Sequence, residues 1–85
     1  MKATITVKVK KFSNGERDLF LAITDCYEWK EALKGLGYRW DDMAKEWYLM
    51  TTKEELREQT IKAVAVMGKG NVRLNCSADA RQMLA

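Results

Sequence analysis

The chain has 85 residues, a formal net charge of +3, two cysteines and no histidine. This length allows one hydrophobic core, and no apolar stretch approaches the roughly 18 residues that span a bilayer, so we expect residues 1–85 to form a single domain without a membrane partner. The lack of histidine removes the commonest general base and zinc ligand. With no CxxC pair and no apolar signal segment, Cys26 and Cys76 are expected to be buried, reduced thiols in a cytoplasmic protein.

Residues 3–10 alternate between apolar and polar side chains, which is typical of a half-buried strand. A turn signal ending at Gly15 follows, and residues 19–23 form the returning strand. A three-residue loop with Gly15 in the left-handed conformation places both apolar sets on one face, whereas a two-residue loop would separate them. We therefore predict a bulged hairpin that puts Phe20 on the outer face beside Lys8. The expected apolar pairs are Val9 with Leu19, Val7 with Leu21 and Ile5 with Ile23.

Residues 25–34 carry apolar side chains at helical spacing, and this pattern predicts a first helix. The pair Thr24-Asp25, followed by Glu28, is typical of an N-terminal capping box. Gly35 and Gly37 are expected to end the helix, because glycine accepts the left-handed conformation that a C-cap needs.

A second hairpin follows, because residues 38–40 and 47–50 are rich in strand-forming side chains and flank a polar stretch. We expect Trp40 to face Trp47 on the buried side of this hairpin. The other expected pairs are Tyr38 with Leu49 and Arg39 with Tyr48.

A longer helix is predicted next, with Thr52 and Glu55 as a second capping box and an end at Gly68. The alternation of residues 72–76 predicts a fifth strand. The tail over 77–85 is expected either to form one or two helical turns that dock its apolar residues, or to fray. The apolar stripe of the longer helix is expected to contain Leu56, Thr60, Ala63, Val64 and Met67, widened by Ile61.

The predicted fold class is therefore α+β, in the order ββα-ββα-β. We expect a mostly antiparallel five-stranded sheet with two helices on one face. Because two amphipathic helices cover only one face of such a sheet, the other face should meet solvent or a partner.

The alternation of side chains along the predicted strands places basic and aromatic residues on this outer sheet face. Basic groups neutralise phosphates and aromatic rings stack on unpaired bases, which is the combination that single-stranded nucleic-acid binders use. The same residues are equally typical of a solvated face on which lysine stems shield two aromatic rings, and Asp18 on that face counts against an anionic ligand. The candidate nucleic-acid-binding residues are Lys8, Lys10, Phe20, Arg39, Tyr48 and Arg73.

Other conspicuous side chains are expected to be structural. Trp29, Trp40 and Trp47 fall on core-facing positions, which favours packing over ligand stacking. The acids within residues 41–46 lack the spacing of a metal site and are typical of a solvated turn. Without a cofactor motif, a paired-carboxylate cleft or a phosphate loop, we assign no catalytic residue, cofactor or metal and expect no enzyme activity.

The run Leu36-Gly37-Tyr38-Arg39-Trp40-Asp41, followed after five residues by Trp47-Tyr48, resembles the LGxxWD…K.WY segment of small bacterial and phage modules of poorly defined function. Such modules occur beside exonuclease-, primase-, helicase- or topoisomerase-like regions of DNA-processing proteins. The resemblance covers residues 31–50 and implies a setting in phage or mobile-element DNA metabolism, without implying catalysis. The implied structural signature is Gly37, Trp40 and Trp47, with Arg39, Lys45 and Tyr48 as its polar and aromatic accompaniment.

Two functions of different classes follow from these features. The first is a small non-catalytic accessory protein that binds nucleic acid, preferably single-stranded, through the open sheet face. The alternative is a protein-interaction or homo-oligomerisation module, in which that face or an exposed edge strand joins a second copy or a DNA-processing protein.

Overall fold

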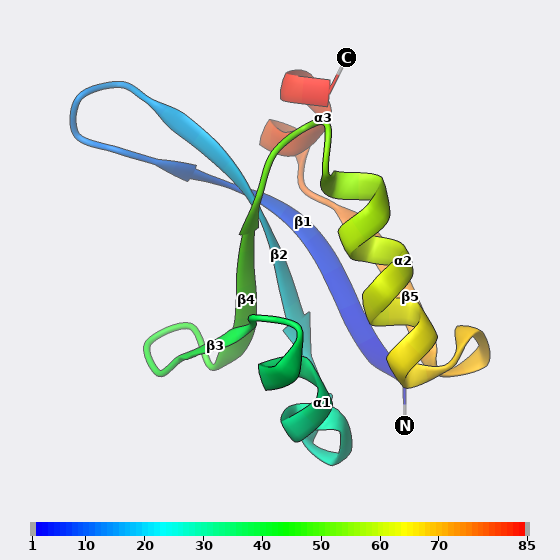
Figure 1. The fold of residues 1–85 in the computed structure, drawn as a ribbon. Coiled ribbons are helices and arrows are strands. Elements are labelled where there is room, and N and C mark those ends of the chain that lie inside the picture. Colours follow the sequence, from blue (N-terminus) through cyan, green and yellow to red (C-terminus); the bar gives the residue numbers. More distant parts are fainter. Residues whose placement is uncertain (1, 85) are drawn as a thin grey trace.

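The computed structural model describes residues 2–84, and within them the chain forms a five-stranded sheet, three α-helices and two short 3-10 turns (Figure 1). The strands are β1 (Ala3–Lys11), β2 (Arg17–Thr24), β3 (Arg39–Asp41), β4 (Glu46–Thr51) and β5 (Val72–Cys76). The helices are α1 (Lys30–Gly35), α2 (Leu56–Met67) and α3 (Ala78–Leu84), and the 3-10 turns are η1 (Tyr27–Trp29) and η2 (Lys69–Asn71). The strand order is β3-β4-β2-β1-β5, and all neighbours are antiparallel except β1 and β5. The α+β class with a mostly antiparallel sheet is confirmed, whereas the number of helices differs from the prediction.

The first hairpin has the predicted bulged register. Gly15 has a φ of +88°, and its N–H donates to the carbonyl oxygen of Phe12 at 3.0 Å. The N–H of Phe12 in turn donates to the carbonyl oxygen of Glu16 at 2.9 Å, so the loop between Phe12 and Glu16 holds three residues. The apolar residues of both strands therefore share one face. The confirmed pairs are Val9–Leu19, Val7–Leu21, Ile5–Ile23 and Lys8–Phe20.

The first helical segment begins later than the expected start of the helix over 25–34. Asp25 has a φ of +57°, which a short polar side chain tolerates, so the chain turns away from β2 before helical hydrogen bonding starts. Thr24 still belongs to β2, and no side-chain hydrogen bond caps η1 or α1. The capping box that Thr24-Asp25 and Glu28 suggested does not form, and that prediction was wrong.

The end of this helical segment agrees with the prediction. The N–H of Tyr38 donates to the carbonyl oxygen of Leu33 at 3.0 Å, and Gly37 between them has a φ of +101°. This is the six-to-one hydrogen bond of a helix C-terminus with glycine in the left-handed region. The reversal turns Tyr38 into the core, where its side chain is 3% exposed.

The second hairpin has the predicted Trp40–Trp47 and Arg39–Tyr48 pairs but buries only one of its two tryptophans. The expected pair of Tyr38 with Leu49 does not form part of it, because β3 begins at Arg39. Trp40 lies opposite Trp47 and Arg39 lies opposite Tyr48, and the two indole rings have centroids 5.5 Å apart. Trp47 is 9% exposed, whereas Trp40 is 47% exposed. Assigning Trp40 to the core was wrong, because β3 is a three-residue edge strand and has a neighbouring strand on one side only.

The longer helix ends where its sequence signal indicated, but it begins at Leu56, later than a cap at Thr52 implies. The hydroxyl of Thr52 accepts the N–H of Glu55 at 3.2 Å, and Gly68 follows the helix with a φ of +91°. Ile61 is 57% exposed and therefore does not widen the buried stripe, contrary to expectation. The buried residues of α2 are Ala63 and Met67, with Leu56, Thr60 and Val64 partly buried.

The tail after β5 is helical, which settles the two alternatives left open by the sequence. The hydroxyl of Ser77 accepts the N–H of Ala80 at 3.2 Å at the start of α3, and Ala80 is fully buried. An ion pair of 3.3 Å between Lys11 and Asp79 ties the helix to the end of β1. This third helix is absent from the expected ββα-ββα-β order. Ala85, the last residue of the expected tail, lies outside the described residues.

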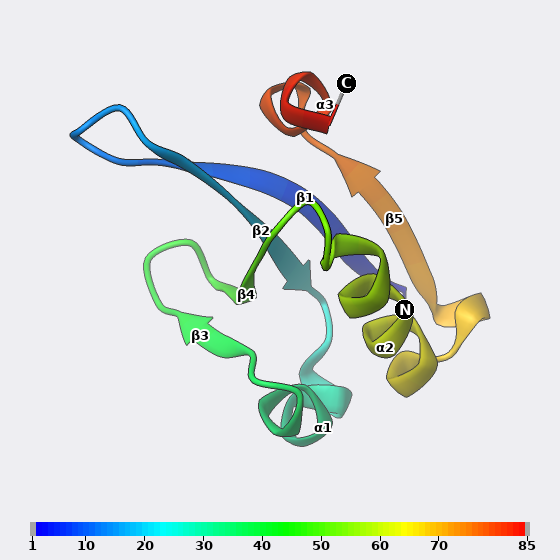
Figure 2. The same cartoon turned by 45° about the horizontal axis from the view of Figure 1, so that its top comes forward.

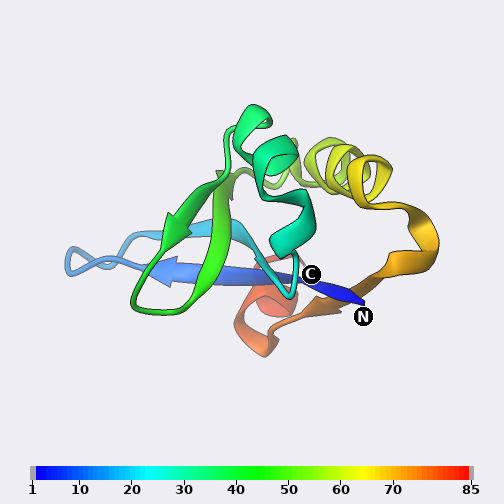
Figure 3. The same cartoon turned by 90° about the horizontal axis from the view of Figure 1, so that it is seen from below.

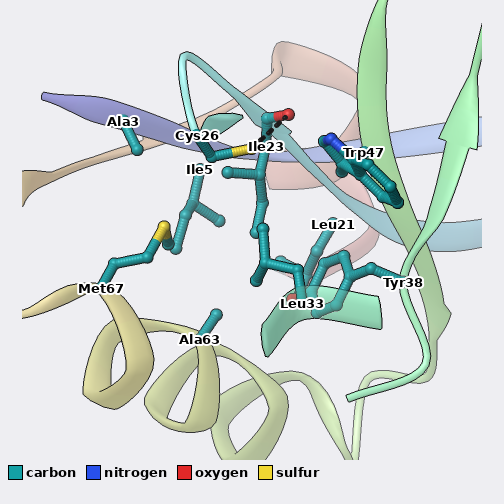
Figure 4. Packing of buried hydrophobic residues seen from close by; sticks show 10 residues of the cluster. All are labelled: Ala3, Ile5, Leu21, Ile23, Cys26, Leu33, Tyr38, Trp47, Ala63 and Met67. Atoms are coloured by element: carbon teal, nitrogen blue, oxygen red, sulfur yellow. Dashed lines mark hydrogen bonds between the residues drawn. The ribbon is translucent and has the colours of Figure 1, made fainter. Parts of the chain in front are cut away.

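The main core lies between the sheet and the pair α1 and α2, which pack on one side of it (Figure 3), while α3 lies at the opposite end of the molecule from α1 (Figure 2). Cys26 is buried in this core as expected, but Cys76 is only partly buried, and both thiols are free. None of the described helices has the length and apolar character that crossing a bilayer requires. The residues that meet in the core are Ala3, Ile5, Leu21, Ile23, Cys26, Leu33, Tyr38, Trp47, Ala63 and Met67 (Figure 4).

Candidate nucleic-acid interface

The six candidate residues share the outer sheet face but are not gathered in one cluster. Residues paired across neighbouring strands point to the same side, so the register defines rows of side chains that cross the sheet. Arg39 shares a row with Tyr48, and Phe20 lies opposite Lys8 in another. Arg73 lies on β5, at the sheet edge opposite to the one that carries Arg39. A ligand bound near one edge of the sheet would therefore not contact both arginines.

Lys8 is committed to an ion pair within the protein. Its Nζ atom donates to Oε1 of Glu46 at 2.8 Å, and the Glu46 side chain is only 6% exposed. A carboxylate so far removed from water needs a nearby cation, which Lys8 supplies. The candidate role of Lys8 as a free phosphate contact is therefore weakened, and the residue is better described as a structural cation.

An open groove of about 490 Å³ lies on the outer face beside this ion pair. Aromatic residues from three strands border it: Phe20 of β2 and Tyr48 of β4 project onto this face, whereas Trp40 of β3 pairs with Trp47 and packs its ring on the core-facing side. Met50 adds an apolar side chain that is 39% exposed, and Lys10 supplies a cation. The groove therefore offers flat apolar surfaces with one positive charge.

Two carboxylates bring negative charge to the same groove. A carboxylate oxygen of Asp41 accepts the N–H groups of Met43 at 3.0 Å and Ala44 at 3.1 Å, and Asp42 forms an ion pair with Lys45 at 3.1 Å. Both acids thus order the turn between β3 and β4. Because they also border the groove, its surroundings are much less positive than the predicted set of residues implied.

The groove unites half of the predicted set and adds one residue that the sequence reasoning assigned elsewhere. Lys10, Phe20 and Tyr48 line it, while Arg39 lies next to Tyr48 around an adjoining hollow. The exposure of Trp40 was missed because its alternation pattern indicated the core. The available signal was its place in a very short strand beside a charged turn, which is typical of a sheet edge.

Ionisable groups with shifted pKa values lie in the core cluster. Burial raises the pKa of the Cys26 thiol to about 11 and the pKa of the Tyr38 hydroxyl to about 12. Within residues 2–84, no group of three or more histidine, cysteine, aspartate or glutamate side chains is placed to hold a metal ion. The groove therefore presents aromatic stacking surfaces and a few charged side chains.

Comparisons with protein-family models, with curated proteins and with solved structures return no match for this chain.

Proposed function

We propose that this protein is a non-catalytic accessory protein that binds single-stranded nucleic acid, with unstacked bases held in the groove. The observation that carries the proposal is the convergence of Phe20 and Tyr48, from two different strands, on one open groove that also contains Lys10. Stacking of a base on an aromatic ring contributes about 1–3 kcal/mol and is tolerant of sequence. Two such contacts would supply useful affinity without specific base recognition.

The charges around the groove favour a single strand over a duplex. A duplex hides the faces of its bases and is bound mainly through many phosphates. Here Lys10 lines the groove and Arg39 lies beside Tyr48, while the Lys8 cation is paired with Glu46. Asp41 and Asp42 would repel further phosphates. The arrangement supports a ligand that offers accessible bases and only a few phosphate contacts.

The biological setting is proposed from the resemblance of residues 31–50 to modules that accompany DNA-processing proteins. On that basis we place the protein in the cytoplasm, in phage or mobile-element DNA metabolism. Neither an enzymatic step nor a cofactor is part of this proposal.

The test is fluorescence anisotropy with a short labelled oligonucleotide, single-stranded or annealed to its complement, at low salt. We expect binding of the single strand and weaker binding of the duplex. Phe20→Ala and Tyr48→Ala should each lower the affinity for the single strand by about 5- to 140-fold, which corresponds to about 1–3 kcal/mol per lost stack. With about two phosphate contacts, log K should fall with log salt at a slope near −1.4, from about −0.7 per contact.

Tyr27→Ala is the matched control, because Tyr27 is an aromatic residue that is 77% exposed and does not line the groove. The affinity of Tyr27→Ala for the single strand should equal that of the parent. Undetectable binding of the single strand at low salt would end the proposal. An equal loss of affinity in Tyr27→Ala and Tyr48→Ala would show that binding does not use the groove.

A second candidate function is self-association, which the sequence also suggested. The specific observation in its favour is the exposed edge of β5, where Leu74 is 62% exposed. This edge is separate from the groove, so both functions are compatible in one molecule.

A further inference from the structure

The open edge of β5 presents backbone groups that no strand of this chain pairs with. Within the described residues, β5 is the last strand of the sheet and pairs with β1 alone. Ser77, just after the strand, donates its N–H to the carbonyl oxygen of Val7 at 2.9 Å. Backbone groups of successive residues in a strand point to alternate sides, so those of Arg73 and Asn75 also point toward β1. The N–H and C=O groups of the alternate residues, Val72, Leu74 and Cys76, point to the open side.

One hydrogen bond agrees with this orientation and limits what the edge can offer. The N–H of Cys76 donates to Oδ1 of Asn75 at 2.9 Å, so it does not bond to β1. The Asn75 side chain thereby covers one of the edge donors. The N–H and C=O groups of Val72 and Leu74 and the C=O of Cys76 are left for an added strand.

The side chains of β5 leave this edge unprotected. Strand edges are normally shielded by proline, bulges or several charges. β5 contains no proline, its only charged residue is Arg73, and its register with β1 runs without a bulge from Val72 to Cys76. Leu74, at the centre of the strand, is 62% exposed. An apolar centre with free backbone groups is a template for strand addition.

We infer that β5 pairs with β5 of a second copy of this chain, antiparallel and about a two-fold axis at Leu74. In this register Leu74 faces Leu74 of the second copy, Arg73 faces Asn75, and Val72 faces Cys76. No like charges face each other, whereas a two-fold axis at Arg73 would bring two arginines together. The two sheets then continue as one across the interface.

The hydrogen bonds of this interface follow from the same register. The two Leu74 residues form a hydrogen-bonded pair and exchange two N–H···O bonds. The N–H of Val72 in each copy donates to the C=O of Cys76 in the other, and this contact leaves the Asn75 side chain in place. The pairing of two five-residue strands lies well below the roughly 1,200 Å² of a stable interface, so the dimer is transient.

Disulfide trapping tests a transient dimer of known register. Opposite residues of a hydrogen-bonded antiparallel pair have Cα atoms about 5.5 Å apart, within the range of about 4.4–6.8 Å that a disulfide accepts. The variant Leu74→Cys, in a Cys76→Ser background, should form a disulfide-linked dimer as its main product under mild oxidation. Cys26 is 3% exposed and does not compete.

Arg73→Cys in the same Cys76→Ser background is the matched control, because it lies on the same exposed strand. In the inferred register the two residues at position 73 lie diagonally, about 7–8 Å apart, where a disulfide does not close. This variant should stay monomeric under the same oxidation. Absence of the Leu74→Cys dimer, or equal dimer formation by both variants, would overturn the inference, and faster dimer formation by Arg73→Cys would overturn its register.

Concentration-dependent amide chemical shifts provide an independent measurement on the parent protein. Shifts confined to Val72–Cys76 should appear as the protein concentration rises and should be lost in Leu74→Lys. Shifts that persist in Leu74→Lys, or that appear in the groove instead, would contradict an interface at β5. Oligonucleotide binding by Leu74→Lys should match that of the parent, so failure of one proposal is distinguishable from failure of the other.

Discussion

Lys8 of β1 reaches across β2 to Glu46 of β4, with 2.8 Å between Nζ and Oε1. On this face, the row of paired residues that lies between the row of Lys8 and the row of Glu46 contains Ala22 of β2. Ala22 is 2% exposed and small enough to let the lysine stem pass over it. The ion pair therefore joins two strands that are not neighbours in the sheet. It lies beside the groove and helps to hold the strand that carries Tyr48.

We expect Lys8→Met to destabilise the protein by about 1–3 kcal/mol. The substitution leaves the Glu46 carboxylate, 6% exposed, without its cation, while the 39% exposure of the Lys8 side chain moderates the cost relative to a fully buried pair. The double variant Lys8→Met/Glu46→Leu should recover most of this loss, because the buried charge is removed. Urea unfolding of the two variants and the parent measures both effects. Equal unfolding midpoints for Lys8→Met and the parent would contradict this description.

Trp47→Ala and Trp40→Ala should differ in how much stability each one costs. Trp47 is 9% exposed within the core, so its truncation should cost about 3–5 kcal/mol. Trp40 is 47% exposed, so its truncation should cost about 1 kcal/mol through the lost contact with the Trp47 ring, and oligonucleotide binding should stay near that of the parent. Thermal melts measure the stability of both variants, and anisotropy titrations measure their affinity for the oligonucleotide. Equal melting temperatures for the two variants would show that Trp40 is as important to the core as Trp47.

Tyr38→Phe should stabilise the protein at neutral pH by about 1 kcal/mol. The Tyr38 hydroxyl oxygen is inaccessible to solvent and has no hydrogen-bond partner among the described residues. A buried polar atom without a hydrogen-bond partner lowers the free energy of unfolding, so removing the atom should raise it. Tyr48→Phe is the control, because the Tyr48 side chain lines the open groove and its stability should stay near that of the parent. A lower unfolding midpoint for Tyr38→Phe would mean that the hydroxyl has a partner in solution.

The pH dependence of stability at high pH follows from the same residue and from Cys26. Burial raises their pKa values from 9.0 to about 11 for Cys26 and from 10.0 to about 12 for Tyr38. The unfolded chain loses both protons first, so the stability present below pH 9 falls as the pH rises toward 12, by about 2–3 kcal/mol for each group. Tyr38→Phe should show a shallower decline between pH 10 and pH 12. Parallel pH profiles of variant and parent would contradict the raised pKa of Tyr38.

Gly37→Ala and Gly35→Ala should have opposite effects on stability. Gly37 has a φ of +101°, so alanine there should cost about 1–2 kcal/mol of backbone strain. Gly35 is helical, its φ is not in the left-handed region, and a Cβ there meets no atom within 4 Å. Alanine at Gly35 should therefore stabilise the protein by about 0.5–1 kcal/mol. Chemical denaturation of both variants measures the signs, and a destabilised Gly35→Ala would contradict the open environment of that position.

Local features of the fold could be predicted from the sequence because neighbouring residues decide them. Alternation along residues 3–10 and 19–23 determines which side chains share a face, and Gly15 allows only one register that keeps the apolar sets together. Gly37 and Gly68 mark helix ends because the backbone there must enter the left-handed region. Asp25 took that conformation without such a signal, which is why the start of the first helical segment was misplaced.

Only the tertiary structure decided which of these positions are covered. Trp40 and Leu74 have the same alternation pattern as buried residues, but the strand order places both on edge strands, so each remains exposed. Lys8 and Glu46 are 38 positions apart and meet only because β2 lies between β1 and β4. The sequence pattern determines the direction in which a side chain points from its own strand. Its burial and its charge partners depend on which strands and helices pack beside it, and those contacts are distant in the chain.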